Sequence, residues 1–221
     1  MQASPAAGTP DAIYFLGDSI TLGWRDEDLG GWPARLMRRL AGQGYSITGY
    51  NLGVRGDTSG EIAERWEQEV GRRQRGSNSL LVFAFGVNDA KVAPDGTYLT
   101  PASDTASSVR RILAAARRHR VLLIGPAPVD EVLMQRHLNQ EGLAAMPTAK
   151  AIDAIARRME SEARSAGVPF LDLLDRLAAN AVWKRSLADT DGLHPSRSGH
   201  DLVADLIQEW PAWAELFPRP R

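Results

Sequence analysis

The chain has 221 residues, of which 43% are hydrophobic and 24% are charged, as is usual for a soluble globular protein. Its 26 Lys and Arg residues nearly balance its 27 Asp and Glu residues, so the net charge of −1 gives no overall attraction to nucleic acid or to an anionic membrane. No cysteine is present, which excludes disulfides, thiolate catalysis and cysteine-based zinc sites.

The amino-terminal stretch MQASPAAGTP has neither the basic start nor the apolar segment of a signal peptide. No run in the chain approaches the roughly 20 apolar residues that a membrane helix needs. We therefore predict a cytoplasmic protein without integral membrane contact, while a secreted form already cleaved from its leader would have the same features. The length favours one domain, so we predict a flexible segment over residues 1–11 and a single domain over residues 12–217.

The first half of the chain alternates between short apolar runs and segments with helical spacing. In chain order we predict a strand in AIYFLG from residue 12, a helix over residues 33–40, a strand in SITGYNLG from residue 46 and a helix over residues 62–70. Pro33 suits the first turn of its helix, because the N–H that proline lacks would be unpaired there.

The second half repeats this alternation. We predict a strand in SLLVFAFG from residue 79, a helix over residues 102–116, a strand in VLLIGPAP from residue 121, a helix over residues 152–163, a strand in VPFLDL from residue 168 and a helix over residues 202–210. Gly167 and Pro211 are expected to end the last two helices.

Strands that alternate with helices of this length predict right-handed βαβ crossovers and a mostly parallel sheet with helices on both faces. We therefore expect a three-layer α/β/α domain. In such folds the ligand site lies outside the carboxyl ends of the strands, so the residues that follow each apolar run are the candidates for a functional site.

A serine and a histidine at this edge suggest nucleophilic catalysis. Ser19 follows the first strand in GDSIT, and a serine hydroxyl becomes an effective nucleophile when a base takes its proton. His194 is the candidate base, and Asp191, three residues earlier in DTDGLHP, could bind its Nδ1 and leave Nε2 for Ser19. The sequence therefore offers a nucleophile, a base and an orienting acid.

Attack on an acyl carbonyl creates an oxyanion that needs preorganised hydrogen-bond donors. The candidates are the backbone N–H of Ser19, the backbone N–H of Gly56 in VRGDT and the side-chain amide of Asn88 in GVND. Glycine at position 56 lets the backbone approach a ligand closely, since it has no Cβ. We predict that these three residues form an oxyanion hole.

Each candidate also has a structural interpretation when it is taken alone. Ser19 could be a helix cap or turn residue, Gly56 and Asn88 lie in common turn sequences, and the Asp191–His194 pair could cap a helix at the surface. The other histidines lack an acidic residue at an equally useful spacing; they are His119, His137 and His200. Only the joint occurrence of these residues at the ends of predicted strands favours a catalytic site.

In combination the blocks resemble the SGNH hydrolase superfamily, whose members are often called GDSL esterases and lipases. The Ser, Gly, Asn and His of the family correspond to Ser19 in GDSIT, Gly56 in GDT, Asn88 in GVND and His194 in DGLHP. Asp191 occupies the family's acid position in the Asp-x-x-His block.

This resemblance runs from about residue 13 to residue 206, and Ile20 stands where the name GDSL has leucine. It implies a flavodoxin-like fold with a five-stranded parallel sheet in the order 2-1-3-4-5. It also implies an ester hydrolase that uses neither a metal nor a cofactor and has a shallow, open active site.

The predicted reaction is hydrolysis of a small or short-chain carboxylic ester through an acyl-enzyme on Ser19. The predicted partner is therefore a small-molecule ester, whereas nothing in the sequence indicates an oligomeric state. Substrate contacts are expected in loops around the rim, at residues 21–32, 90–100, 126–147 and 182–190, with Trp24, Tyr98 and Trp183 as the candidate side chains.

Other activities remain open at this point. Within the superfamily the alternatives are a carbohydrate O-acetylesterase and a lysophospholipase or thioesterase. Outside it, a flavodoxin-like module that binds a ligand without turnover is disfavoured, because neither G-x-G-x-x-G nor G-x-x-x-x-G-K-[ST] occurs. A metal-dependent hydrolase is disfavoured because no second histidine lies at ligand spacing from His194.

Overall fold

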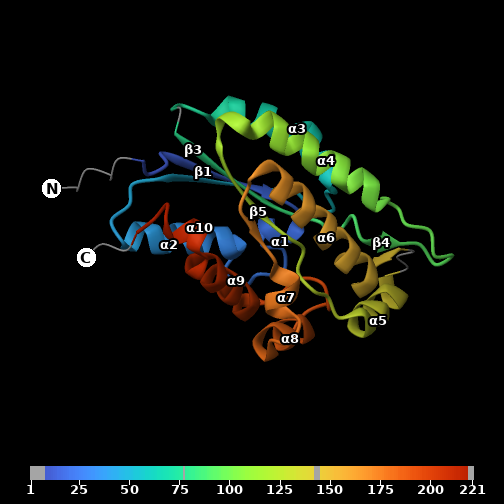
Figure 1. Cartoon of the computed structure of the whole chain (residues 1–221). Coiled ribbons are helices and arrows are strands. Elements are labelled where there is room, and N and C mark those ends of the chain that lie inside the picture. The colour runs from blue at the N-terminus through green and yellow to red at the C-terminus, as the bar shows by residue number, and fades with distance from the viewer. Residues whose placement is uncertain (1–7, 77, 142–144, 219–221) are drawn as a thin grey trace.

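Five parallel strands form the central sheet. The computed structural model describes residues 8–76, 78–141 and 145–218. The strands are β1 (Ala12–Gly17), β2 (Thr48–Gly53), β3 (Ser79–Ala84), β5 (Arg120–Ile124) and β7 (Phe170–Leu171), in the spatial order β2-β1-β3-β5-β7 (Figure 1). Counted along the chain this order is 2-1-3-4-5, so the predicted topology is confirmed.

One face of the sheet is covered by the first and last long helices. Ile13 and Phe15 of β1 point to this face and pack with α2 (Gly31–Gly42), α9 (Arg197–Glu209) and α10 (Pro211–Ala214). Both side chains are at most 1% exposed. Burial of each such side chain stabilises a fold by about 1.5–3 kcal/mol, so the packing on this face contributes substantially to the stability of the domain.

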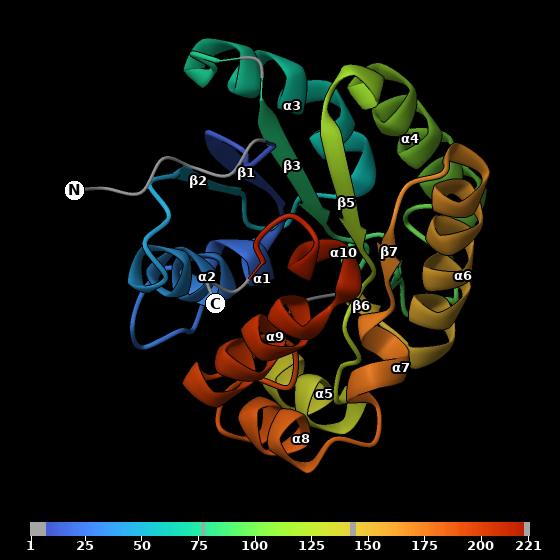
Figure 2. The same ribbon diagram turned by 60° about the vertical axis from the view of Figure 1, so that its left-hand side comes forward.

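The alternate residues of the same strand point to the opposite face. Tyr14 and Leu16 pack with α3 (Ser59–Arg73), α4 (Ala102–Ala115) and α6 (Ala149–Ala166). The two helix layers lie on opposite sides of the strands in Figures 1 and 2. The predicted three-layer α/β/α class is therefore confirmed. Because the helices cover both faces of the sheet, a binding site is expected at the ends of the strands.

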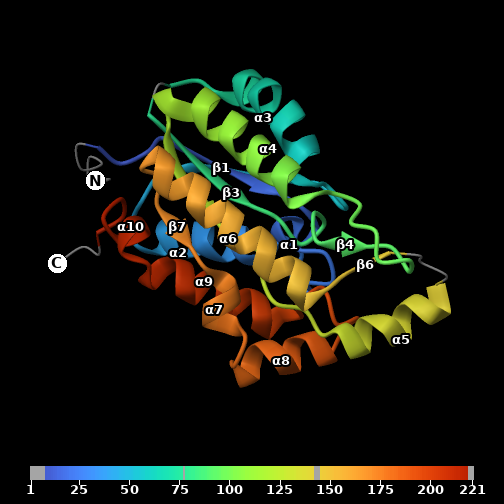
Figure 3. The same cartoon turned by 45° about the vertical axis from the view of Figure 1, so that its right-hand side comes forward.

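Shorter elements complete the fold. They are α1 (Ser19–Leu22), the antiparallel pair β4 (Lys91–Val92) and β6 (Met146–Pro147), η1 (Ala116–Arg118), α5 (Glu131–Glu141), α7 (Leu173–Leu177) and α8 (Ala181–Ala188). All of them except η1, which precedes β5, lie in connections that follow the carboxyl ends of the strands. In Figure 3, α5 extends beside the β4–β6 pair, with α8 next to it at the same end of the molecule.

Two of these helices replace segments that the sequence predicts as rim loops. Residues 126–147 contain α5 and residues 182–190 lie mostly within α8. The short α8 starts where the Asn180 side chain accepts hydrogen bonds from the N–H groups of Val182 and Trp183, at 2.9 and 3.1 Å. A helix of eight residues is too short for a repeating apolar pattern to predict it. The position where α8 starts depends on the single cap at Asn180.

A buried arginine joins the first long helix to the last. Arg35 of α2 is 3% exposed, and its guanidinium donates to both carboxylate oxygens of Asp26, at 2.7 and 3.0 Å, and to Asp201 of α9. The Asp26 carboxylate also accepts the N–H of Gly31 at 2.9 Å. Breaking one side of a buried ion pair typically costs about 3–5 kcal/mol, so the Arg35–Asp26 pair fixes the loop before α2, and the half-exposed Asp201 links α9 to the same guanidinium.

The amino-terminal segment is described from residue 8. Residues 1–7 of the predicted flexible segment lie outside the described part. Thr9 accepts a hydrogen bond from the Asn78 side chain, and the N–H of Asp11 donates to the Asn78 carbonyl at 2.9 Å. Residues 8–11 therefore bind to the start of the sheet. Among the described helices, none combines the length and the apolar character needed to cross a bilayer.

Candidate active site

Ser19 stands at the first position of α1, directly after β1. The Asp18 side chain accepts the N–H of Ile20 at 2.9 Å and so caps this one-turn helix, which Gly23 ends in the left-handed region at φ 88°. A Cβ on Gly17 would lie only 2.2 Å from the carbonyl oxygen of Ala84. Glycine is therefore required where the strand turns, and this sharp turn holds Ser19 at the edge of the sheet.

Three predicted residues form a continuous hydrogen-bonded chain. The Ser19 Oγ lies 2.9 Å from Nε2 of His194, although 175 positions separate the two residues. Nδ1 of His194 lies 2.8 Å from Oδ2 of Asp191. With the proton on Nδ1, the histidine presents its free Nε2 lone pair to the serine hydroxyl, which is the arrangement that general-base activation needs.

The Asp191 carboxylate also organises the backbone of its own loop. Its Oδ1 accepts the N–H groups of Leu193 and His194, at 3.0 and 2.9 Å. Burial by itself would raise the pKa of Asp191, but the hydrogen bonds and the charge of His194 outweigh burial and hold that pKa well below its usual range. Asp191 is therefore ionised at neutral pH. Its Oδ2 contacts Nδ1 of His194, whereas its Oδ1 binds the backbone of the loop.

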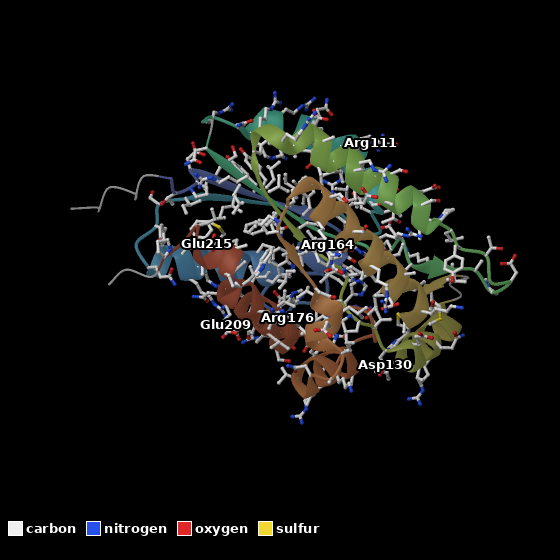
Figure 4. The ribbon with its side chains drawn as sticks, in the orientation of Figure 1. Arg111, Asp130, Arg164, Arg176, Glu209 and Glu215 are labelled. Atoms are coloured by element: carbon white, nitrogen blue, oxygen red, sulfur yellow. The ribbon has the colours of Figure 1, made fainter. Side chains whose placement is uncertain are left out.

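A glycine places this loop against α5. Gly192 has φ +83°, and its carbonyl accepts the N–H of Asp130 at 2.8 Å. A Cβ at position 192 would lie 2.8 Å from the Asp130 carbonyl oxygen, from Cβ of Leu133 and from the N atom of Met134. Asp130 stands at the base of α5 (Figure 4). Only glycine permits this approach, which brings the histidine loop against the start of α5.

The predicted oxyanion donors line the same pocket as Ser19 and His194. Gly56 has φ +86° and open space where a Cβ would be. Asn88 is 6% exposed and donates one Nδ2–H to the carbonyl of Asp57 at 3.0 Å, which orients its amide. Within the described ranges, the N–H groups of Ser19 and Gly56 donate to no other residue, so both are available to a ligand.

An arginine connects the Gly56 loop with the Ser19 turn. Arg65 of α3 donates to the Asp57 carboxylate at 2.6 Å and to the carbonyl of Gly17 at 3.0 Å. The β2–α3 loop and the β1–α1 turn are thus fixed to one guanidinium. This link was not predicted from the sequence, because it depends on which face of α3 is turned to the sheet edge.

Asp89 is a buried acid with a structural role, and this role was not predicted from the sequence. It is fully buried, and its carboxylate accepts the N–H and Oγ–H of Ser59 and the Oγ–H of Thr105 at the starts of α3 and α4. Burial is the main cause that raises its pKa, while these hydrogen bonds lower it. Asp89 thereby fixes the loop that carries Asn88. Its position directly after Asn88 is the only sequence signal for this role.

His200 and His119 do not line the pocket. His200 is fully buried in α9, and burial lowers its pKa to about 4, so it is neutral under ordinary conditions. Burial likewise lowers the pKa of His119. Neither residue lines the pocket that contains Ser19, whereas His137 of α5 does.

The buried carboxylate of Asp18 predicts an unusual pH dependence of stability. Asp18 is 2% exposed, and desolvation raises its pKa to about 6, against the lowering effects of the Ile20 N–H and His194. A carboxyl whose folded-state pKa exceeds the unfolded value destabilises the fold above the folded pKa, and this effect disappears as the pH falls to the unfolded pKa. The window therefore runs from about pH 6 down to about pH 4.

We expect Asp18→Asn to gain stability relative to the wild type as the pH rises through this window, by an amount on the order of 3 kcal/mol at most. Urea denaturation of both proteins at pH 4.5 and pH 7 measures the difference, and the comparison removes the contributions of all other titrating groups. Asp172→Asn, which changes the N-cap of α7, is the control. Equal differences at the two pH values would contradict the prediction.

The pocket around these residues has a volume of about 580 Å³. Its walls come from six separate segments of the chain, and they are lined by Ser19, Trp24, Arg25, Arg55, Gly56, Asn88, Lys91, Met134, His137, Ala145, Met146, Pro147, Asp191, Leu193 and His194. A larger hollow of about 680 Å³ lies at the other end of the strands, next to α4, α6 and α10, and holds none of the predicted site residues. The predicted catalytic residues therefore lie at the smaller cavity.

Of the three predicted substrate contacts, the structure places only Trp24 on the pocket. Trp183 is 1% exposed, because it occupies the inward face of α8 and donates its Nε1–H to the carbonyl of Pro128 at 2.9 Å. Tyr98 is 44% exposed and pairs with Val92, the last residue of β4, and it is not part of the pocket lining. The prediction for Trp183 is therefore wrong, because Trp183 is a core residue, while Tyr98 is a surface residue outside the pocket lining.

The pocket also contains cations that were not predicted from the sequence. Arg25, Arg55 and Lys91 line it, although none was predicted as a site residue. Each lies close in sequence to a predicted site residue, and this adjacency is the signal that could have indicated them. Arg55 directly precedes Gly56, and Lys91 follows Asn88 by three positions.

A known protein family and a curated relative are similar to this chain over most of its length. Residues 15–202 match the model of the GDSL-like Lipase/Acylhydrolase family. The chain is 29% identical over 210 residues to GDSL lipase Rv0518 of Mycobacterium tuberculosis, covering 88% of this chain and 79% of that protein.

Two solved structures have the same fold. A lipase/acylhydrolase from Enterococcus faecalis has a TM-score of 0.71 at 22% identity, covering 89% of this chain and 92% of that one. An acetyl xylan esterase from Geobacillus stearothermophilus has a TM-score of 0.69 at 19% identity, covering 97% of each chain. Since the family model spans most of the sequence, this chain belongs to the GDSL-like lipase/acylhydrolase family.

Proposed function

We propose that this chain hydrolyses carboxylic esters through an acyl-enzyme on Ser19. Membership of the family implies a hydrolase of the esterase or lipase type. The observation that carries the finer proposal is the chain from Ser19 Oγ to His194 Nε2 at 2.9 Å and from His194 Nδ1 to Asp191 at 2.8 Å.

In the first half of the reaction Ser19 Oγ attacks the ester carbonyl carbon while His194 Nε2 takes the hydroxyl proton. The resulting imidazolium is stabilised by the ionised Asp191. The negative charge that develops on the carbonyl oxygen is received by the N–H groups of Ser19 and Gly56 and by the Asn88 amide. His194 then gives its proton to the leaving alcohol, and the C–O bond to that alcohol breaks.

Water completes the cycle. His194 removes a proton from water, the hydroxide attacks the acyl carbon, and the proton returns to Ser19 Oγ as the acid leaves. Both halves use the same donors for the oxyanion, because the carbonyl oxygen stays in place while the attacking group changes. Every step uses a group that already lies at this edge of the sheet.

The pocket supports a substrate of modest size. Its volume of about 580 Å³ is within the range of sites for small molecules, roughly 300–1,000 Å³. Apolar side chains form part of its lining, and they include Trp24, Met134, Met146 and Leu193. We therefore propose a small or short-chain ester, with the apolar side chains against its hydrocarbon part.

The test combines labelling with turnover. A fluorophosphonate is expected to form one adduct on Ser19, located by mass spectrometry, and Ser19→Ala is the control that should take no label. The protein should also hydrolyse p-nitrophenyl acetate and butyrate faster than the octanoate, with or without EDTA. A label on another residue, or activity that EDTA abolishes, would contradict the serine mechanism, and constant rates through octanoate would contradict the preference for short chains.

A further inference from the structure

The pocket beside Ser19 carries positive charge that the chain as a whole lacks. Arg25, Arg55 and Lys91 line it, whereas Asp191 is the one acid among the described side chains of its lining. Asp191 is already bound to His194 at 2.8 Å. The formal net charge of the whole chain is −1, so this excess of cations is local to the pocket.

Several arginines elsewhere on the surface are paired with acids. Side chains of both signs cover the outer helices (Figure 4), where Arg164 of α6 lies 2.7 Å from Glu160 and Arg110 of α4 lies 2.7 Å from Glu162. Among the residues that the structure describes, Arg55 is one of the arginines with no acid within ion-pair distance, and it is the one of these that lines the pocket. Its hydrogen-bond donors are therefore open to a ligand.

Arg55 is also held in place. Its guanidinium carbon lies 3.5 Å from the ring centroid of Trp24, which is the geometry of a cation–π stack. A stacked guanidinium keeps its edge free, and that edge presents N–H groups in a planar fork that fits two oxygens of one anion. Because Arg55 directly precedes Gly56, this fork is next to a donor proposed for the oxyanion.

Arg25 adds a second fixed cation on the same tryptophan. Its guanidinium carbon lies 5.8 Å from the Trp24 ring, and its Nε lies 3.5 Å from the Asp191 carboxylate. The backbone of Arg25 is in the left-handed region at φ 70°, a conformation that costs a residue with a Cβ about 1–2 kcal/mol. Asp26, anchored by Arg35 at 2.7 Å, holds the chain in this turn.

Lys91 approaches from another side of the pocket. It belongs to β4, which pairs with β6 at Pro147, another residue of the lining. Glu61 interacts electrostatically with Lys91, but the Glu61 carboxylate accepts hydrogen bonds from the N–H and Oγ–H of Thr58, at 2.7 and 2.8 Å. Cations therefore enter the pocket from the α1–α2, β2–α3 and β3–α4 connections.

We infer that the ester substrate carries an anionic group, a carboxylate, sulfonate or phosphate, which binds the Arg55 guanidinium with Arg25 and Lys91 beside it. This inference rests on the proposed hydrolysis at Ser19 and specifies the class of ester. The anion lies on the acyl part or on the alcohol part of the substrate, and two pairs of probes distinguish these positions.

Each pair compares a charged ester with its neutral methyl ester. For the acyl part the pair is mono-4-nitrophenyl adipate and 4-nitrophenyl methyl adipate. For the alcohol part it is 4-acetoxybenzoate and methyl 4-acetoxybenzoate. In one of the pairs the wild type is expected to show a kcat/KM about 10- to 100-fold higher for the anionic ester. Hydrogen bonds between charged groups typically strengthen an interaction by about this factor. High salt should reduce this ratio, since Arg55 is exposed.

Substitutions at position 55 test the assigned residue. Arg55→Gln should lower the ratio of anionic to neutral kcat/KM about tenfold or more, and Arg55→Lys should keep part of it. Arg38→Gln, on the exposed face of α2, is the matched control and should leave both rates as in the wild type.

A wild-type ratio near one in both pairs, or a ratio that Arg55→Gln leaves unchanged, would overturn the inference while leaving the esterase intact. If instead no ester is hydrolysed and Ser19 takes no fluorophosphonate, the proposed function itself fails. The two failures are therefore distinguishable in one set of assays.

Discussion

Replacing Asp191 by Asn is expected to lower kcat about 10⁴-fold while the protein stays folded. Oδ1 of Asp191 accepts the N–H groups of Leu193 and His194, and an asparagine oxygen can do the same. Its amide nitrogen then replaces Oδ2, 2.8 Å from Nδ1 of His194. An amide N–H facing Nδ1 favours the tautomer with its proton on Nε2, so the lone pair no longer faces Ser19.

Steady-state hydrolysis of p-nitrophenyl acetate and the rate of fluorophosphonate labelling both measure this effect. Thermal unfolding by circular dichroism should stay within a few degrees of the wild type. Asp189→Asn, at the end of α8, is a control close in sequence that should leave kcat unchanged. A kcat within tenfold of the wild type for Asp191→Asn would exclude the assigned role of Asp191.

Replacing Asn88 by Ala is expected to lower kcat by about 10²- to 10³-fold with little change in KM, because loss of one oxyanion donor costs about 2.7–4 kcal/mol of transition-state stabilisation. The substitution also leaves the Asp57 carbonyl without the amide that binds it at 3.0 Å. A loss of stability of about 1 kcal/mol should accompany the kinetic effect.

A second asparagine separates the kinetic loss from the loss of stability. Asn180→Ala removes the N-cap of α8 and should lower the free energy of unfolding by about 1 kcal/mol without lowering kcat. If Asn88→Ala behaved like Asn180→Ala, losing stability alone, Asn88 would have a structural role only. Kinetics and urea denaturation of the two variants decide between these outcomes.

The parallel topology explains why the sequence could indicate the site. Since all five strands point the same way, residues that follow them meet at one edge, whatever the lengths of the intervening helices. Ser19, Gly56 and Asn88 could be placed together on that ground, and the spacing of Asp191 before His194 indicated the pairing of these two residues. These inferences required the order of the elements and no knowledge of side-chain orientation.

The directions in which side chains point could not be predicted from the sequence. Trp183 was expected at the rim, but the cap at Asn180 sets the rotation of α8 and turns the indole into the core. The stack of Arg55 on Trp24 joins two loops whose relative position is set by the fold. Contacts of this kind depend on the packing of helices and loops, for which the pattern of apolar residues contains no signal.

The ion pair between α2 and α9 has a consequence for the order in which the site is completed. Arg35 joins Asp26, close after Ser19, to Asp201, close after His194. A chain that is still leaving the ribosome therefore has its proposed nucleophile long before its proposed base. Under the proposed mechanism no ester can be cleaved until the last long helix has docked, so recovery of activity after dilution from denaturant should report complete assembly of the domain.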